Sequence, residues 1–256
     1  AKEFWETMRK ELSPEMFAQE IEAEMVAAEG AVYGRHFLNN TCNDDLEGGN
    51  VIHLDPAKTT RKAPQRYHLI GGIDWGTGYN TFLAIVRDTV ADIDIICDEM
   101  CLDGMTVEQS TYEIAKRIKE YPQRLGLEMH SVYTDPNGKE WNTSLKRKVP
   151  GTCRVIYTWI KEFTAIHTGV EIVSRRILDA AGRRRLFISR DVVAMTQSGP
   201  GGRGIYQGIT GGYRYSKIIK TGAFRPEPHK DGKFDHSCDA LRYALVNTYY
   251  SVLYKT

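Results

Sequence analysis

The chain has 256 residues, of which 41% are hydrophobic and 26% charged, a balance typical of a globular domain with one substantial core. No apolar run approaches the ~20 residues that a membrane-spanning helix needs, and no signal-peptide pattern opens the sequence. The five cysteines are an odd number, which favours free thiols in a reducing compartment over a disulfide framework. Cys97 and Cys101 are spaced like half a zinc site, but the second half is missing, so packed thiols are the preferred interpretation.

The net charge of +1 conceals an uneven distribution of charge along the chain. Residues 1–138 contain 13 Lys and Arg against 24 Asp and Glu, whereas residues 139–225 contain 17 against 5. Tyrosines and a tryptophan are interleaved with the basic clusters, which suits a polyanion such as nucleic acid. For any single cluster, a solvated helix face is the alternative. The side chains expected to contact DNA are Lys146, Arg147, Lys148, Arg183, Arg184, Arg185, Arg203, Arg214, Lys230 and Lys233.

Residues 1–30 have the pattern of amphipathic helices, with apolar residues three and four positions apart. Ser13 and Pro14 stand where an N-cap and a first helical position belong, and Gly30 stands where a helix ends. Polar stretches follow. We therefore expect residues 1–60 to form a linker arm that docks outside this chain, and residues 61–256 to form the main domain. Because the sequence begins with Ala, we also expect a fragment or a processed product.

From Tyr67 onward the pattern is that of an α/β domain. Three strands in a row with short turns predict an antiparallel meander, after which helical and strand-like runs alternate. Pro122 is expected to stop the helix that precedes it. A glycine-rich stretch over 198–212 predicts a mobile loop, and the Walker pattern of a P-loop ATPase is absent from the sequence. The predicted strands are 68–74, 80–88, 92–100, 131–135 and 185–189, and the predicted helices are 106–121, 142–149, 169–181 and 235–253.

Three acidic residues stand at the ends of predicted elements. Asp74 ends the first strand, Asp135 ends the fourth, and Asp239 lies in the first turns of the last helix. Carboxylates that converge on one point repel one another unless cations neutralise them, so the pattern predicts a hard-oxygen metal site. Favourable placement near a helix N-terminus is the alternative for Asp239, and a turn at "DPNG" is the alternative for Asp135. Gly72 and Gly76 are expected to leave room for backbone or phosphate beside the site.

The order of these elements is that of an RNase H-like fold. "GIDWGTG", followed much later by "DHSCDALRYAL", resembles the nuclease domain of the large terminase subunit of tailed bacteriophages. "YRYSKI" with "RPEPHKDGKFDH" is similar to the strand and β-hairpin that precede the last helix in that family, and "LSPEMFAQEIEAEMVAAEGAVYGRHF" is similar to the segment that joins its ATPase and nuclease domains. The likeness covers nearly the whole chain. It implies an α/β fold with a central mixed sheet flanked by helices, preceded by a helical linker arm from an ATPase domain that this sequence lacks.

The resemblance implies a metal-dependent endonuclease that cuts double-stranded viral DNA concatemers during genome packaging. Asp74, Asp135 and Asp239 match the metal ligands of the family, with His236 and Asp235 as neighbours, and would bind two Mg²⁺ or Mn²⁺ ions. Asp74 would bridge the ions, and His236 would ligate one or orient the attacking water. Little sequence specificity is expected, since metals and basic side chains contact phosphate rather than bases. The implied partners are double-stranded DNA, the ATPase domain of the same polypeptide, the portal and the small terminase subunit, in the cytoplasm of an infected bacterium.

Three alternatives stay open. An actin- or sugar-kinase-like ATPase shares the "GIDWGTG" pattern, but the second D-x-G loop and the adenosine motif of that superfamily are missing. A RuvC-like junction resolvase is closer in chemistry, and the spacing of His236 and Asp239 resembles it, although resolvase chains are shorter and lack the N-terminal arm. A non-catalytic DNA-binding or packaging-motor module that retains the nuclease fold is the alternative from another functional class.

Overall fold

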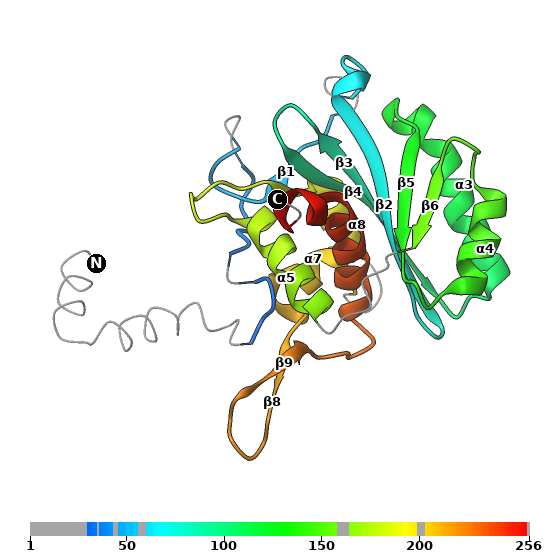
Figure 1. The fold of residues 1–256 in the computed structure, drawn as a ribbon. Helices are drawn as coiled ribbons and strands as arrows, with labels where there is room; N and C mark the ends of the chain where they lie inside the picture. Colours follow the sequence, from blue (N-terminus) through cyan, green and yellow to red (C-terminus); the bar gives the residue numbers. More distant parts are fainter. Residues whose placement is uncertain are drawn as a thin grey trace.

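The computed structural model describes residues 30–34, 36–42, 46–55, 60–157, 164–198 and 203–254. The strands of the central sheet are β1 (Val51–Ile52), β2 (Tyr67–Trp75), β3 (Tyr79–Asp88), β4 (Ile93–Asp103), β5 (Met129–Thr134), β6 (Arg154–Tyr157) and β7 (Leu186–Ser189). They form a seven-stranded mixed sheet in the order β1-β7-β4-β3-β2-β5-β6 (Figure 1). β2, β3 and β4 pair antiparallel, β5 and β6 continue the sheet in parallel beyond β2, and β7 and β1 do so beyond β4.

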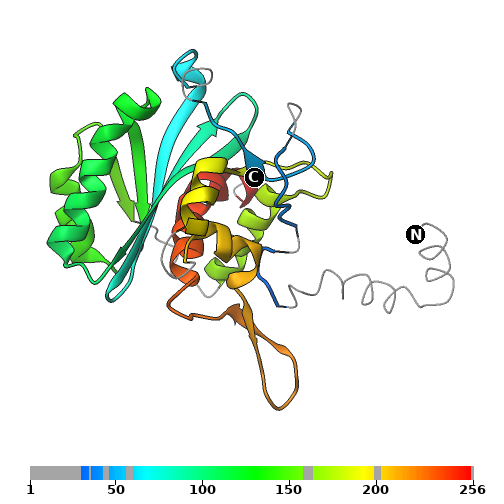
Figure 2. The same ribbon diagram turned by 180° about the vertical axis from the view of Figure 1, so that it is seen from behind.

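Helices cover both faces of this sheet. They are α3 (Val107–Leu125), α4 (Lys139–Lys148), α5 (Thr164–Ile177), α6 (Arg190–Ser198), α7 (Ile205–Gln207) and α8 (Asp235–Tyr254), with short helical turns η2 (Pro64–Arg66) and η3 (Gly208–Gly212). α3 and α4 lie on one face, whereas α5, α7 and α8 lie on the other (Figures 1 and 2). A separate hairpin, formed by β8 (Tyr215–Lys217) and β9 (Phe224–Pro228), leads into α8. No helix in these described ranges is long and apolar enough to cross a membrane.

The predicted α/β architecture is confirmed, including the antiparallel meander at its centre. β2 is apolar at consecutive positions because helices cover both of its faces. Leu69 and Ile73 belong to the core under α3, and Ile70 belongs to the core under α8. All three side chains are at most 3% exposed. A strand buried on both faces therefore carries the first of the three predicted site carboxylates.

The predicted stop at Pro122 is wrong, because α3 continues to Leu125. The helix begins with reciprocal hydrogen bonds between Thr106 and Gln109, and it ends at Gly126 in the left-handed conformation, with φ 71°. A proline within a helix removes one backbone hydrogen bond but leaves side-chain packing intact. The last turns of α3 stay in place because their apolar side chains, Leu125 among them, are buried against the sheet.

The described part of the glycine-rich stretch is packed and helical rather than a loose loop. Ile205 and Ile209 are fully buried in the core beside α8. A Cβ on Gly208 would come within 2.7 Å of the Cys238 sulfur, so glycine allows this turn to lie directly against α8. The mobile loop predicted over 198–212 is therefore absent over residues 203–212, and residues 199–202 lie outside the described residues.

Part of the predicted linker arm packs on this domain. Tyr33 and Phe37 are buried in the core beside α8, and β1 pairs with β7 at the edge of the sheet. The buried side chain of Asn50 bonds to the backbone at three positions outside its own turn, which fixes this segment on the fold. Residues 1–29 lie outside the described residues, so the helical arm and the domain boundary at residue 60 stay predictions.

The first turns of α8 lie unusually close to β2. A Cβ on Gly72 would come within 2.1 Å of the Ala240 carbonyl oxygen, so only glycine admits the helix backbone at this distance. At Gly76, a Cβ would come within 2.4 Å of the His236 ring. The predicted room beside these two glycines is therefore filled by α8 itself, which brings the helix into contact with the strand that carries Asp74.

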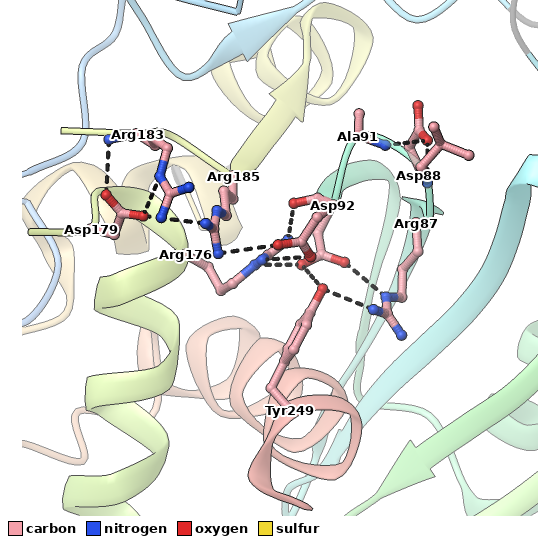
Figure 3. A network of polar contacts seen from close by, with 11 residues as sticks. Arg87, Asp88, Ala91, Asp92, Arg176, Asp179, Arg183, Arg185 and Tyr249 are labelled. Atoms are coloured by element: carbon pink, nitrogen blue, oxygen red, sulfur yellow. Dashed lines mark hydrogen bonds and ion pairs between the residues drawn. The ribbon is translucent and has the colours of Figure 1, made fainter. Parts of the chain in front are cut away.

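A buried ion-pair network fastens the far end of α8 to the start of β4 (Figure 3). The Asp94 carboxylate is fully buried and accepts hydrogen bonds from Tyr249 Oη at 2.8 Å, Arg176 Nε at 3.0 Å and Arg87 Nε at 3.1 Å. Arg176 also bonds to Asp92, at 2.9 Å. These side chains come from the end of β3, the start of β4, α5 and α8. The network therefore joins two central strands of the sheet to two of the helices that cover it.

We expect Gly72→Ala to lower the free energy of unfolding by about 1–3 kcal/mol, because the added methyl group forces α8 away from β2. In a domain of this size the melting temperature should fall by roughly 3–10 °C. Gly151→Ala is the matched control, because a Cβ there meets nothing within 4 Å. Thermal unfolding followed by circular dichroism checks both variants, and equal melting temperatures would contradict the packing argument.

Candidate active site

The three predicted carboxylates lie at one end of the sheet. Asp74 is the second-last residue of β2, and Asp135 directly follows β5, the parallel neighbour of β2. The backbone N–H of Asp135 continues the ladder by donating to the Ile73 carbonyl at 3.1 Å. Asp239 reaches the same end from α8, and its charge raises the pKa values of both other carboxyls. Asp74, Asp135 and Asp239, which are far apart in the sequence, thus lie at the same end of the sheet.

Asp74 is paired with His236. Its Oδ2 lies 2.7 Å from His236 Nδ1, and the Asp74 residue is only 6% exposed. Burial raises the pKa of Asp74 to about 6, and the neighbouring Asp239 adds to this rise, whereas the His236 hydrogen bond opposes it. In return, the hydrogen bond to Asp74 raises the pKa of His236. Asp74 and His236 therefore form a hydrogen-bonded pair in which each group shifts the pKa of the other.

Asp239 is the most heavily bonded of the three carboxylates, and it is 1% exposed. Its Oδ1 accepts from Arg242 Nη2 at 3.0 Å and from Tyr213 Oη at 3.2 Å, while its Oδ2 accepts from Lys230 Nζ. Burial alone would raise the pKa of Asp239, but Arg242 and Lys230 together hold it below its usual value. Asp239 is therefore the site carboxylate whose negative charge is best balanced by neighbouring cations.

Asp135 is held through its own backbone. Its carbonyl accepts from Asn142 Nδ2 at 3.0 Å, and Asn142 Oδ1 accepts from Trp75 Nε1 at 2.7 Å. Trp75 in turn stacks on Trp141, with ring centroids 5.1 Å apart. The fully buried Asn142 side chain therefore ties the loop after β5 to the end of β2. This bridge fixes the spacing between Asp135 and Asp74.

Asp235, predicted as a neighbour of the metal site, opens α8 and is 4% exposed. Burial raises the pKa of its carboxyl, and contact with Asp231 raises it further. Its Oδ1 is buried and lacks a hydrogen-bond partner among the described residues. A buried carboxylate oxygen without a partner is costly, so this atom points to a cation or a water at the site.

The donor chemistry of this cluster fits a divalent cation. Carboxylate oxygens with one nearby imidazole are the ligands that Mg²⁺ and Mn²⁺ accept. Burial raises the pKa of Asp135, so gathering negative charge here costs free energy that a cation offsets. Within the described ranges, no group of three or more His, Cys, Asp or Glu stands close enough together to hold one ion, and Lys230 and His236 bond to the carboxylates instead.

One predicted DNA-binding residue lies beside the carboxylates on the β4 side. The Arg203 guanidinium lies 5.5 Å from the centroid of the Tyr79 ring and 3.7 Å from Asp103. The Tyr79 ring in turn lies 5.2 Å from the His236 ring. Three more of the predicted side chains belong to the hairpin and the turn before α8, namely Arg214, Lys230 and Lys233.

The arginine cluster at 183–185 lies at the opposite end of the sheet. Asp94 N donates to the Arg185 carbonyl at 2.7 Å, and Asp94 is level with the start of β2, six residues before Asp74. At about 3.3 Å per strand residue, roughly 20 Å separates this cluster from the carboxylates. Arg183 pairs with Asp179, and Arg185 pairs with both Asp179 and Asp92 (Figure 3). These arginines therefore do not belong to the carboxylate site.

The basic cluster at 146–148 forms the last turn of α4. Lys146 and Arg147 are exposed, whereas Lys148 donates to Glu108 at 2.8 Å and to Thr111 at 3.0 Å. Two of its three charges thus face solvent, and a DNA contact at this turn stays a prediction.

No protein-family model and no curated protein sequence matches the chain. Among solved structures, the large terminase of the thermophilic bacteriophage D6E has a TM-score of 0.55 and 18% identity, over 86% of this chain and 45% of that one. The large terminase nuclease of the thermophilic phage G20c, with bound magnesium, has a TM-score of 0.50 and 13% identity, over 85% of this chain and 97% of that one. This chain has the fold of a terminase nuclease domain. It spans less than half the length of the D6E terminase, and the RNase H-like fold expected from the sequence is confirmed.

The sequence analysis missed two residues that support the candidate site. Arg242 stands three residues after Asp239 on the same helix, a spacing that should have indicated an ion pair. Glu99, in the middle of β4, carries no such signal. Its carboxylate is 3% exposed and accepts from Ser237 Oγ at 2.6 Å and from Ile205 N at 2.9 Å. It therefore fastens the first turn of α8 to the sheet, between His236 and Asp239.

The pKa of Glu99 supports a pH test of this anchor. Burial raises this pKa to about 7, against the opposing effect of the Ser237 and Ile205 hydrogen bonds. The unfolded chain ionises near pH 4.5, so folding stability should fall as pH rises from about 4.5 to about 7, by roughly 3 kcal/mol. Glu99→Gln stays neutral and should lose much less stability over that interval, as urea denaturation at pH 5 and pH 8 would show.

Glu128→Gln is the matched control for this measurement, because the Glu128 side chain is exposed just before β5. It should reproduce the pH dependence of the wild type. An equally large loss of stability between pH 5 and pH 8 in Glu99→Gln would show that folding does not raise the pKa of Glu99.

Proposed function

We propose that this chain is a metal-dependent endonuclease that cleaves double-stranded DNA as the nuclease part of a phage packaging terminase. The observation that carries the proposal is the meeting of Asp74, Asp135 and Asp239 at one end of the sheet, from three separate elements. The fold likeness to the large terminases of phages D6E and G20c supports it. Neither charge repulsion nor burial would favour this arrangement in a domain that had only to fold.

The ions would be Mg²⁺ or Mn²⁺, held by Asp74, Asp135 and Asp239, with Asp235 and His236 at the margin of the site. A bound ion of this kind activates a water and stabilises the charge that develops on the scissile phosphate. The G20c terminase nuclease was solved with bound magnesium, which supports this choice of ion. A two-ion arrangement, with Asp74 shared between the ions, is part of the proposal.

His236 would move a proton during the reaction. Its Nδ1 is bonded to Asp74, so Nε2 is the nitrogen that would exchange a proton with a water or a phosphate oxygen. The Asp74 hydrogen bond fixes the orientation of the ring, and packing against Tyr79 limits its rotation. Arg203, beside Tyr79, would contact the DNA backbone next to the cleavage site.

The remaining partners follow from the same proposal. Double-stranded DNA would be the substrate, read with little sequence specificity because the site presents carboxylates and cations rather than base-recognising side chains. The ATPase domain of the same polypeptide, the portal and the small terminase subunit would be the other components, acting in the infected bacterial cell. A non-catalytic packaging module with the same fold would bind DNA but fail the cleavage test below.

We expect the wild-type chain to nick and linearise supercoiled plasmid with Mn²⁺ or Mg²⁺, and to lose this activity in EDTA. Asp74→Asn should reduce the rate by at least about 100-fold. Its melting temperature should be unchanged or higher, because the buried Asp74 carboxyl is already costly to ionise. Asp191→Asn is the matched control, since Asp191 is exposed in the first turn of α6 and is not one of the site residues. Retained cleavage by Asp74→Asn would remove it from the active site.

Asp239→Asn should also abolish cleavage, but with lower stability, because the buried Arg242 would lose the charge it is paired with. For this reason Asp74→Asn is the decisive variant of the two.

The Lys230–Asp239 ion pair gives a prediction that does not depend on activity. A divalent ion bound to Asp239 Oδ2 must displace the Lys230 ammonium from that oxygen. We therefore expect Lys230→Ala to bind Mn²⁺ roughly 5- to 10-fold more tightly than the wild type, as about 1 kcal/mol of competing ion pair is removed. Isothermal titration calorimetry measures this, with Lys233→Ala as the control because Lys233 packs over Phe234 instead. Equal affinities in the wild type and Lys230→Ala would show that the ion does not use Asp239.

A further inference from the structure

The β8–β9 hairpin projects from the body of the domain, next to the start of α8 (Figures 1 and 2). Every residue from Lys217 to Pro226 is exposed. At its tip, Ile219 is 101% exposed and Ile218 is 38% exposed. A fully exposed isoleucine gains nothing from folding, since burial of such a side chain is worth about 1.5–3 kcal/mol. The tip therefore offers apolar surface to something outside the described residues.

The turn that carries Ile219 is well ordered by its own hydrogen bonds. The Ile218 carbonyl accepts from Gly222 N at 2.8 Å, and Ile218 N donates to the Ala223 carbonyl at 2.7 Å. Gly222 adopts the left-handed conformation, with φ 69°, that closes the turn. Ile219 therefore stands at the outermost point of a closed turn, where it is presented without further ordering of the backbone.

Positive charge surrounds this apolar tip. Between Arg214 and Lys230, five Lys and Arg accompany a single acidic residue, Glu227. Lys220 directly follows Ile219, and Arg225 lies on the opposite limb of the hairpin. An isoleucine bounded by cations is poorly suited to an apolar protein groove but matches a polyanion with an apolar interior, which is the chemistry of duplex nucleic acid.

One open hollow of about 660 Å³ lies along the hairpin, and its lining includes both the tip residue Ile219 and Lys230. Lys220 and Arg225 also line this hollow. Lys230 is the residue that donates to Asp239. At about 3.3 Å per residue, the limb between Lys230 and the turn spans roughly 25 Å, the length of about seven base pairs. A duplex lying on this surface would reach the carboxylates and the tip at once.

We infer that the β8–β9 hairpin enters the minor groove of the substrate duplex, where Ile219 wedges between stacked base pairs and the flanking cations bind the two phosphate strands. The inference rests on the proposed function. Apolar wedges on narrow protein elements unstack one base step and bend the duplex, and minor-groove cations add affinity without reading sequence. The bend would lie about seven base pairs from the scissile phosphate and hold that phosphate against Asp74 and Asp239.

The inference is tested with the 256-residue chain in the Asp74→Asn background, so that DNA is bound but not cut. A short duplex carries fluorophores at its two ends for energy transfer, and 2-aminopurine at several internal positions reports unstacking. At saturating concentrations, the protein that retains Ile219 should raise both the energy transfer between the fluorophores and the fluorescence of 2-aminopurine. Ile219→Ser should abolish both signals while weakening affinity only about 3- to 10-fold.

Matched variants separate the wedge from the charges. Lys220→Ala and Arg225→Ala should each weaken binding and reduce the slope of log affinity against log salt by about 1, with both signals retained at saturation. Val90→Ser is the control for Ile219→Ser, because Val90 is an apolar residue that is 74% exposed in the turn between β3 and β4. It should change neither the DNA affinity nor the two fluorescence signals. Netropsin, which fills the minor groove, should compete with the wild-type hairpin.

Two outcomes distinguish this inference from the proposed function. If Ile219→Ser bends and unstacks the duplex like the parent, the wedge is overturned, and the tip serves a protein partner instead. If the wild-type chain never cleaves plasmid with Mn²⁺ yet Ile219→Ser abolishes bending, the nuclease proposal fails and the wedge stands as a DNA-bending device.

Discussion

The contact between the backbone of α8 and Gly72 of β2 is the constraint on which the rest of the site depends. With a Cβ at Gly72 the helix could not approach, because the Ala240 carbonyl occupies that space. The close approach places His236 beside Asp74 and brings Asp239 to the end of the sheet where Asp135 also lies. Glu99 then holds the first turn of the helix from the neighbouring strand. The site is thus built by backbone proximity first, and by side-chain bonding second.

The same proximity gathers negative charge that the domain must balance. Arg242 lies on α8 itself and is 7% exposed, so its charge is a permanent part of the site. Lys230 differs, because 59% of its side chain is exposed and it arrives from the hairpin. A fixed cation and an exchangeable one therefore share the Asp239 carboxylate. A divalent ion bound at Asp239, as proposed, would displace Lys230, which lies on the segment between the hairpin and α8.

Much of the fold and the core of the site could be predicted from the sequence, because both leave periodic or positional signals. Strands that end abruptly on Asp74 and Asp135 stand out against apolar runs, and the "DHSCDALRYAL" helix places Asp239 by spacing alone. The predicted metal ligands and DNA contacts stay predictions. Their placement nevertheless separates the basic residues into those beside the carboxylates and those roughly 20 Å away.

What the sequence could not reveal depends on partners distant in the chain. The arginines at 183–185 form one basic cluster in the sequence. In the folded chain, Asp92 and Asp179 pair with Arg183 and Arg185 and neutralise much of the positive charge. Glu99 reads as an ordinary polar residue of a strand, and its role appears only when Ser237 and Ile205 pack over it. The glycine-rich stretch likewise has the sequence of a mobile loop. Its order depends on the apolar surface of α8, which is distant in the sequence.

The ends of the sheet bear on how the molecule behaves among its own copies. An open edge strand presents unsatisfied backbone groups that can pair with another chain and begin aggregation. Here the described sheet ends on β1, of two residues, and on β6, of four, and both are too short to template an extended ladder. The exposed Arg154 at the start of β6 adds a charge that opposes such pairing. The two short edges therefore protect the described sheet from pairing edge to edge with another copy of the chain.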